Sequence, residues 1–597
     1  MRYPFGPFTV AVALLLSGCE CNGSNRNASK QPPTNAVGPP HSGAPVVWVV
    51  DDTQRIAQAS GTSPAMQGGA IWSPHAPIKL FGLHDETLAF QVIVSAGDRP
   101  LHGVEIDIRG AAPCMEVRRF VVHDLPMKRR SGGNTPRRSL GWTAAAMPPA
   151  VAAGGALPDV LIPSELAPRW ADYPMTVKPG RHRVVWFDIT IAEHAAAGRC
   201  DATVVVHNQV AHGNRQLSVP LASMALQLEV GAPTLPYRSV KTMVYYSPQE
   251  LLSRFDDGRI VALHEQLLHR HQLSSIMPLR SAADVERHGA ALDGTLFTSV
   301  HGYRGAGVGV ASDIVVIGAY GSMGPPSAAA LRQLREVLAA LAQRGIASAT
   351  QDILLYTVDE QCDSPLSAAW RHALDQAGGQ LAQLKVGHSC STTPAEQPVD
   401  VVLVMADAYH PDSANAAIEA GKQVWIYNGV LPYTGSFLSD SWPLSLRANA
   451  WIQARYKIER WFYWESTFWN DDNRGGLGPY DPLAGAETFH NSDGDHCNGD
   501  GVLVYPATQS SGFRSLNSLA VLPSIRLKQW RRGISDIGYL ALAKQRNPRA
   551  ADAILARIVP RALSAAKGMS APPFSVRPQD YQRARRQLFE LIAHPAR

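Results

Sequence analysis

This chain of 597 residues has few cysteines, a small net charge and few long apolar runs. None of its seven cysteines belongs to a CxxC pair and no HExxH motif is present, so the spacings typical of zinc sites are missing. The formal charge of +5 is small, and the densest basic run, Lys128–Arg130, lies among Ser, Gly, Asn and Pro residues. A nucleic-acid partner is not expected, because such surfaces need basic residues interleaved with aromatic ones or aligned along a helix.

The apolar run at the N-terminus, Phe8–Leu16, is too short for a membrane span, which needs about 20 residues. A positive residue precedes it, and Leu16–Cys19 (LSGC) resembles the lipobox of bacterial lipoproteins. We predict a signal peptide over residues 1–18 and a diacylated Cys19 that anchors the chain to a membrane. Glu20 is not the usual residue for inner-membrane retention, which favours the outer membrane. An ordinary secretory signal is the alternative.

Residues 19–45 are mostly Asn, Ser, Pro and Gly, which predicts a flexible tether between the anchor and the folded body. The remaining cysteines fit an exported protein, since disulfides form in oxidising compartments. Two fall in the first predicted domain and three in the second, namely Cys114, Cys200, Cys362, Cys390 and Cys497. The sequence leaves their pairing open.

Residues 46–235 predict a β-sandwich. Short β-branched or alternating runs are separated by clusters of Gly, Pro and Asp, and no long helical period intervenes. The clearest runs are Val46–Val50, Thr87–Val94, Val104–Ile108, Val184–Ile191 and Ala202–Val206.

From residue 236 to 522, strands alternate with helical segments. Eight short apolar runs can be counted: Val240–Tyr246, Leu273–Leu279, Asp313–Tyr320, Ile353–Val358, Gln383–Gly387, Val399–Met405, Gln423–Asn428 and Arg460–Glu465. Segments between them, such as Ala328–Ala342, carry apolar residues three and four positions apart. Eight such units predict a (β/α)8 TIM-like barrel, and residues 523–597 predict helices packed on it. An open doubly wound sheet is the alternative, but no Gly-rich dinucleotide turn follows the first strand.

Two adjacent acids, Asp359 and Glu360, follow the fourth predicted strand. In barrels of this type, catalytic groups lie at the carboxyl ends of the strands. Mutual repulsion between neighbouring carboxylates raises the proton affinity of one of them, as a general acid requires. The sequence therefore predicts Glu360 and Asp359 as catalytic residues. Acids that merely cap the next helix are the alternative.

Aromatic and polar residues gather at the ends of the last two predicted strands. Aromatic faces stack on the apolar faces of pyranose rings, while Asn and Glu side chains bind hydroxyl groups. Packing in the barrel core is the alternative for about half of these aromatics. The predicted substrate-binding residues are Trp464, Glu465, Trp469, Trp425, Tyr427 and Asn428.

Motifs spread over most of the chain resemble glycoside hydrolase family 123 and its relatives with the C-terminal domain of unknown function 4091. Those in the N-terminal half are Asp85–Val92 and Pro158–Pro163. Those of the barrel and beyond are Tyr356–Glu360, Gly421–Asn428, Phe462–Trp464, Gly499–Pro506, Pro523–Leu527 and Arg531–Asp536. Each motif is loose, and their order carries the resemblance.

The resemblance implies a retaining β-N-acetylgalactosaminidase that acts on amino-sugar glycans with substrate assistance. The 2-acetamido oxygen of the sugar attacks C1, so no carboxylate nucleophile is needed. Glu360 is then the acid that protonates the leaving oxygen and later activates water, and Asp359 holds the acetamido N–H. Gln361-Cys362 follows the pair where the family pattern predicts proline.

Two other functions remain open from the sequence. Glu465 is the candidate nucleophile of a conventional retaining glycosidase, in which its carboxyl group would lie about 5–5.5 Å from that of Glu360. A lipoprotein that binds polysaccharide without cleaving it is the non-enzymatic alternative.

The acidic loop after residue 490 is not expected to bind a metal. Asp493, Asp495, Asn498 and Asp500 lie at a spacing similar to that of a cation loop, but Cys497 stands where EF-hand spacing needs an oxygen ligand. We predict a Gly-rich loop over the barrel mouth instead, and nothing in the sequence calls for a cofactor.

Overall fold

The computed structural model describes residues 43–58, 63–111, 113–132, 155–167, 173–390, 397–470, 481–490, 496–507, 518–569 and 571–593. The predicted signal peptide, Cys19 and most of the predicted tether lie outside these residues, as do Asp493 and Asp495. Within the described part of the chain, no helix has both the length and the apolar character that crossing a membrane requires.

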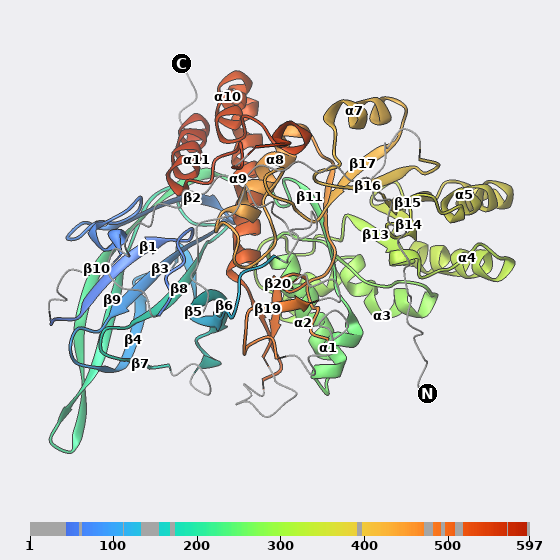
Figure 1. Cartoon of the computed structure of the whole chain (residues 1–597). Coiled ribbons are helices and arrows are strands. Elements are labelled where there is room, and N and C mark those ends of the chain that lie inside the picture. The colour runs from blue at the N-terminus through green and yellow to red at the C-terminus, as the bar shows by residue number, and fades with distance from the viewer. Residues whose placement is uncertain are drawn as a thin grey trace, which may run out of the picture. The chain divides into compact units, whose positions relative to one another are not determined.

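Two five-stranded sheets make up the N-terminal region (Figure 1). The first has the order β1-β3-β8-β5-β6 and the second β2-β10-β9-β4-β7. All neighbours are antiparallel except β2 and β10. The strands are β1 (Val46–Asp51), β2 (Ile78–His84), β3 (Thr87–Ser95), β4 (Leu101–Arg109), β5 (Met115–Pro126), β6 (Ala156–Pro163), β7 (Met175–Val177), β8 (His182–Ile191), β9 (Gly198–His212) and β10 (Arg215–Thr234).

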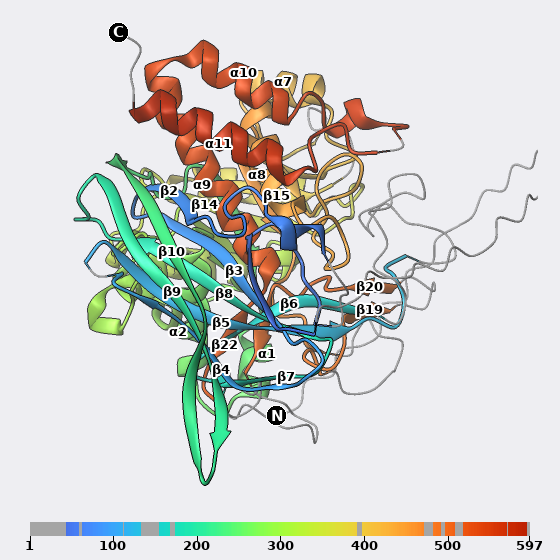
Figure 2. The same ribbon diagram turned by 90° about the vertical axis from the view of Figure 1, so that its left-hand side faces the viewer.

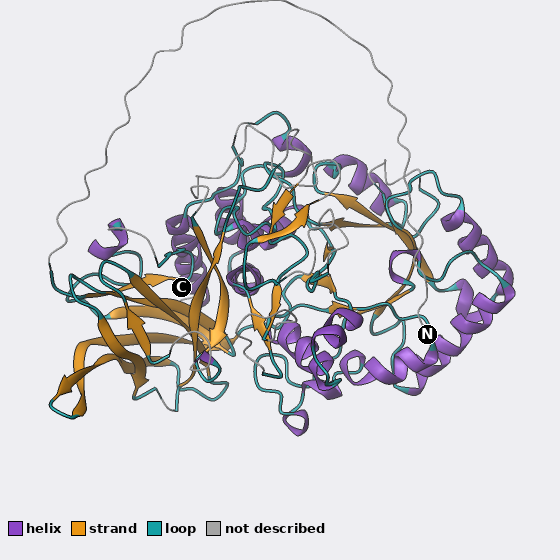
Figure 3. Ribbon diagram, turned by 60° about the horizontal axis from the view of Figure 1, so that its bottom comes forward, coloured by secondary structure: helices purple, strands orange, loops and turns teal. Residues whose placement is uncertain are grey.

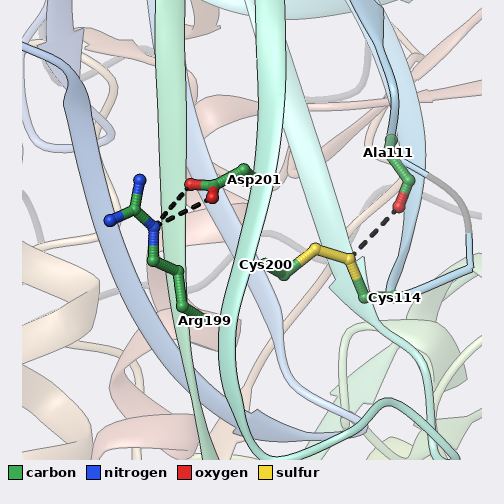
Figure 4. Close-up of a disulfide and its surroundings, with 5 residues drawn as sticks. All are labelled: Ala111, Cys114, Arg199, Cys200 and Asp201. Carbon is green, nitrogen blue, oxygen red and sulfur yellow. Dashed lines mark hydrogen bonds and ion pairs between the residues drawn. A yellow bond between two sulfur atoms is a disulfide. The ribbon is translucent and has the colours of Figure 1, made fainter.

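The apolar faces of both sheets contribute to one core. Phe90 of β3 stacks on Phe187 of β8 with ring centroids 5.3 Å apart, and both side chains are fully buried. The Cys114–Cys200 disulfide joins the start of β5 in the first sheet to β9 in the second (Figure 4). Figure 2 shows β9 and β10 continuing beyond the sheet as a long hairpin.

Eight parallel strands follow and form a nearly closed barrel (Figure 3). Their order around the sheet is β12-β11-β18-β17-β16-β15-β14-β13, and a parallel bridge between Leu279 and Ile317 lies at the seam. All eight apolar runs predicted from the sequence form strands of this sheet. These are β11 (Lys241–Tyr245), β12 (Ser275–Ile276), β13 (Ile314–Ile317), β14 (Asp352–Val358), β15 (Lys385–Ser389), β16 (Val401–Met405), β17 (Gln423–Tyr427) and β18 (Arg460–Tyr463).

Amphipathic helices cover the barrel. In α4 (Ala328–Gln343), Ser327 caps the first turn, and the buried residues Ala330, Leu334, Val337 and Leu341 recur every three or four positions on one face. The others before the C-terminal segment are α1 (Pro248–Arg254), α2 (Arg259–Arg270), α3 (Ala282–Leu292), α5 (Leu366–Ala377), α6 (Gly379–Ala382), α7 (Pro411–Glu419) and α8 (Ser445–Tyr456). Short strands β19 (Glu487–His490), β20 (His496–Asn498), β21 (Val504–Pro506) and β22 (Val521–Pro523) follow β18.

The C-terminal helices α9 (Ile525–Arg546), α10 (Pro548–Ile558) and α11 (Pro578–Ala593) connect the two halves of the fold. Although α9 begins with the basic sequence RLKQWRR, its cations are buried and bind carboxylates of the N-terminal sheets. The ion pairs are Arg526–Asp159, Lys528–Asp188, Arg531–Asp188 and Arg532–Glu86, and Arg585 of α11 also binds Glu86. Several motifs that carry the family resemblance therefore form this interface.

Candidate active site

The acid pair leaves the barrel at the carboxyl end of β14. This strand is buried from Ile353 to Val358, whereas Asp359 and Glu360 are both exposed. The pairing of β14 with β15 shifts by one residue at Thr357, immediately before the pair. Such irregularities in a sheet redirect the side chains that follow them. Glu360 has a φ of 53°, in the left-handed region that costs a residue with a side chain about 1–2 kcal/mol.

Two hydroxyl groups hold the carboxylate of Asp359. The Tyr356 hydroxyl donates to Asp359 Oδ1 at 3.0 Å, and the Ser389 hydroxyl donates to the same oxygen at 2.7 Å. Ser389 Oγ also accepts the backbone N–H of Glu360 at 2.9 Å, so one side chain from β15 fixes both acids. Among the described residues none donates a hydrogen bond to Asp359 Oδ2, and the side chain is exposed.

From the described residues, the carboxyl group of Glu360 receives one hydrogen bond, which the hydroxyl of Tyr427 at the end of β17 donates to Oε1 at 2.7 Å. Although the residue is exposed, the walls around its carboxyl group partly desolvate it and raise its pKa above the ordinary value. The Tyr427 hydrogen bond acts in the opposite direction, and the charge of Asp359 raises the pKa further. A carboxyl group with a raised pKa that keeps one oxygen open has the properties of a general acid.

Aromatic rings line the barrel interior below the pair. Tyr320 contacts Tyr245 with ring centroids 4.9 Å apart, Tyr356 at 5.5 Å and Phe462 at 6.1 Å. The hydroxyl of Tyr320 donates to the backbone oxygen of Trp464, which ties the strand end of β13 to that of β18. Because Tyr356 also donates to Asp359, this aromatic cluster adjoins the acid pair.

Asn428 and Trp464 lie side by side at the ends of β17 and β18. The backbone N–H of Trp464 donates to Asn428 Oδ1 at 3.2 Å, and its indole N–H donates to Asp500 Oδ1 at 3.0 Å. Asn428 and Trp464 are both half-buried. A positive φ of 55° at Asn428 lets its own carbonyl accept the indole N–H of Trp461 at 2.8 Å. Their exposed surfaces leave both residues able to contact a ligand.

Two predicted substrate contacts belong to the core instead. Trp425 has no exposed surface, and its indole N–H points towards Glu459, which precedes β18 at the opposite end of the barrel. Trp469 is also fully buried and donates to the backbone oxygen of Val504 at 3.0 Å. Packing, the alternative for these aromatics, accounts for both tryptophans as the structure places them.

Glu465 is buried beside the mouth, with 5% of its surface exposed. Its Oε1 accepts the backbone N–H groups of Ser466 at 2.8 Å and Thr467 at 2.7 Å and the hydroxyl of Thr467 at 2.9 Å. Burial raises its pKa to about 8, so the group is protonated near neutral pH. A protonated carboxyl group is a poor nucleophile, and the geometry favours a structural role in the turn after β18.

Ser389, Tyr356 and a second disulfide are parts of the site that local sequence patterns did not indicate. Cys362, the unexpected residue after the pair, bonds to Cys390, which directly follows Ser389. Serine and cysteine are adjacent at the end of a predicted strand, but their alignment with β14 depends on the strand register. Cys497 is buried.

No group of three or more His, Cys, Asp and Glu side chains in the described ranges is arranged to hold a metal ion. In the acidic loop after residue 490, Asn498 binds the backbone oxygen of Arg129 and the carboxylate of Asp440. Asp500 accepts the hydrogen bond of Trp464. The amide nitrogen of Asn498 and Oδ1 of Asp500 are therefore engaged in protein contacts.

Comparison with known proteins assigns the chemistry. Residues 327–543, which include the acid pair, match the family model "Glycoside hydrolase 123, catalytic domain". Among solved structures, a family 123 glycoside hydrolase from Clostridium perfringens, studied for glycolipid glycan hydrolysis, matches with a TM-score of 0.58 at 10% identity over 92% of this chain and 97% of that one. A β-glucuronidase from Parabacteroides merdae matches with a TM-score of 0.22 at 10% identity over 77% of this chain and 45% of that one. No curated protein matches the sequence significantly. Residues 327–543 therefore match a glycoside hydrolase 123 catalytic domain, and the chain is a glycosidase.

Proposed function

We propose that this chain is a retaining, exo-acting glycosidase for β-linked 2-acetamido sugars, with N-acetyl-β-galactosaminides as first candidates. One observation carries the proposal: each acid of the pair has one oxygen fixed by hydroxyl groups and one oxygen open to a substrate. Oδ1 of Asp359 is fixed by Tyr356 and Ser389, and Oε1 of Glu360 is fixed by Tyr427. The likeness to the Clostridium perfringens enzyme, which hydrolyses glycolipid glycans, supports a glycan substrate.

In the first step, Glu360 gives its proton to the glycosidic oxygen as the bond from C1 to that oxygen breaks. The acetamido carbonyl oxygen forms the new bond to C1 and gives an oxazolinium intermediate. Asp359 accepts the acetamido N–H through its open oxygen and stabilises the positive charge that develops there. In the second step, Glu360 takes a proton from water, the water oxygen bonds to C1, and the acetamido group is regenerated with retention of configuration.

The two-carboxylate alternative is not favoured. It requires an ionised nucleophile, whereas the raised pKa of Glu465, about 8, keeps that group protonated near neutral pH. The hydrogen bonds from Ser466 and Thr467 to Oε1 lower the pKa of Glu465, but the effect of burial outweighs them. Glu465→Gln preserves those contacts and is the matched control for variants of the acid pair.

The test is a comparison of nitrophenyl glycosides. The wild type should hydrolyse an N-acetyl-β-galactosaminide or N-acetyl-β-glucosaminide and leave the β-galactoside without the acetamido group intact. A thiazoline analogue of the intermediate should inhibit competitively. Comparable turnover of the β-galactoside would show that the acetamido group takes no part. Full activity in Glu360→Gln would remove the acid pair from the mechanism.

We also propose that the enzyme is held at the bacterial outer membrane by lipid on Cys19. The short apolar run before this residue supports export, and two disulfides support an oxidising compartment. Cys19→Ala should release the enzyme from the membrane fraction and abolish labelling by a palmitate analogue. Cys21→Ala is the matched control and should remain membrane-bound. Membrane attachment of Cys19→Ala would contradict the assignment.

A further inference from the structure

A disulfide between Cys362 and Cys390 lies directly beside the acid pair. Cys362 stands two residues after Glu360, and Cys390 directly follows Ser389. The two Cα atoms are 5.2 Å apart, and the bridge joins the segment after β14 to the segment after β15. It therefore connects by a covalent bond the same two strand ends that Ser389 connects by hydrogen bonds.

The covalent and hydrogen bonds together close a small ring. Ser389 Oγ accepts the N–H of Glu360 at 2.9 Å and donates to Asp359 Oδ1 at 2.7 Å. Hydrogen bonds through Ser389 therefore link the bridged cysteine next to it back to the acid pair. Ser389 and Cys390 are each 1% exposed, which anchors one side of the ring in the packed barrel. The other side contains Glu360, whose left-handed backbone needs a restraint from its surroundings.

The segment that the ring closes is irregular, and a turn in which the Ser364 N–H donates to the Gln361 carbonyl oxygen at 3.0 Å is its main backbone hydrogen bond among the described residues. Between Glu360 and α5, which begins at Leu366, the described residues form neither strand nor helix, and Gln361 is exposed. An exposed segment of this kind ordinarily samples several conformations. A general acid must be placed closely, because a displacement of about 1 Å can lower turnover by about a hundredfold.

We infer that the Cys362–Cys390 bridge and Ser389 are a positioning device for Asp359 and Glu360, so that full turnover requires the bridge to be oxidised. The inference rests on the proposed function, in which these two acids do the chemistry. Cys362, Cys390 and Ser389 act through the pair and are not themselves catalytic residues.

The chain offers a matched control in its other disulfide, Cys114–Cys200, which lies between the N-terminal sheets. The test compares C362S/C390S, C114S/C200S and Glu360→Gln with the wild type, using whichever nitrophenyl glycoside the wild type hydrolyses. In C362S/C390S, kcat should fall tenfold or more, KM should stay within twofold, and the descending limb of the pH profile should move to lower pH as Asp359 separates from Glu360. C114S/C200S should lower the melting temperature and keep kcat within twofold.

The outcomes separate this inference from the proposed function. Activity in Glu360→Gln means that the proposed function fails, whatever the bridge does. If Glu360→Gln is inactive while kcat of C362S/C390S stays within twofold of the wild type, the inference about the bridge is overturned and the proposed function stands. If C114S/C200S loses as much kcat as C362S/C390S, the Cys362–Cys390 bridge contributes only to the general stability of the protein. That result also overturns the inference.

If C362S/C390S does not fold, reduction of the folded C114S/C200S protein replaces it. A water-soluble phosphine supplies two electrons, the disulfide takes them with two protons to give two thiols, and the phosphine leaves as its oxide with oxygen from water. Cys362 is partly exposed and gives the reagent access. Turnover should fall in step with the appearance of the two thiols and return on reoxidation. Ser389→Ala, measured with the bridge intact, should also lower kcat. Unchanged turnover in both experiments overturns the inference.

Discussion

Carboxylates occur in two contrasting settings in this molecule, at the barrel mouth and at the junction between the N-terminal sheets and α9. At the mouth, Asp359 and Glu360 are exposed, form hydrogen bonds only with hydroxyl groups, and have no ion-pair partner among the described residues. At the junction, Glu86, Asp159 and Asp188 are buried and bind arginine or lysine.

Charge compensation explains the difference. Burial alone would raise the pKa of Asp188, but Arg531 and Lys528 hold it well below its ordinary value, so the group stays ionised. No cation in the described part of the chain does this for Glu360, and its pKa is raised. A carboxylate saturated by cations stabilises the fold as long as every partner is present, whereas one without cations can exchange protons with a substrate.

The largest effect that this comparison predicts is on turnover at the mouth. Glu360→Gln keeps the size and the Tyr427 contact of the side chain but removes its proton. We expect kcat to fall by about 10²–10⁴, with a melting temperature close to that of the wild type. Steady-state kinetics and thermal unfolding measure the two quantities. A large drop in melting temperature would mean that the pair is structural.

The same substitution at the junction should have the opposite result. Glu86→Gln leaves Arg532 and Arg585 with an uncharged partner in a buried setting. Breaking a buried ion pair in this way costs about 3–5 kcal/mol of unfolding free energy. Denaturant unfolding should show this loss, while kcat of the folded fraction should stay within twofold. Unchanged stability would show that Asp52 and Asp536, the other ion-pair partners of Arg532 and Arg585, compensate these cations without Glu86.

A smaller effect is expected from Tyr427→Phe, which removes the hydrogen bond that lowers the pKa of Glu360. Because Glu360 must be protonated to act as an acid, activity falls as pH rises through its pKa. Without the Tyr427 hydroxyl this pKa rises further, so the descending limb of kcat/KM against pH should move to higher pH. A limb that moves to lower pH would contradict the assignment to Glu360.

The smallest effect is expected where charge pairs face water. Arg199 and Asp201 form an exposed pair at 2.8 Å beside the Cys114–Cys200 disulfide (Figure 4). Exposed pairs contribute about 0–1 kcal/mol. Asp201→Asn should therefore change the free energy of unfolding by no more than that range, and it should leave turnover unchanged. A cost as large as that of Glu86→Gln would show that burial is not what separates the two settings.

Much of the barrel followed from local patterns in the sequence. Apolar runs predicted all eight of its strands, and the meeting of parallel strand ends at one edge of a barrel predicted that Asp359, Glu360 and Tyr427 lie near one another. Side-chain direction was harder to predict. The aromatic cluster around Trp464 includes surface and core positions, and a run of apolar residues does not reveal that Trp469 points inward.

Long-range partners were the part that the sequence could not supply. The basic start of α9 has the appearance of a solvated helix, and its burial depends on carboxylates more than 300 positions earlier, such as Asp188 for Lys528. Ser389 was missed for a related reason, because its contact with Asp359 requires the register of β14 against β15. Both kinds of contact arise from tertiary structure and not from local periodicity.

The pairing of Glu86 with Arg585 joins positions 499 residues apart. A chain made from its N-terminus therefore completes its first sheets long before the cations that neutralise Glu86, Asp159 and Asp188 have been synthesised. Until those helices are made, these three acids lack the cations that bind them in the folded chain. The junction between the N-terminal sheets and the C-terminal helices can therefore form only once the whole chain is present.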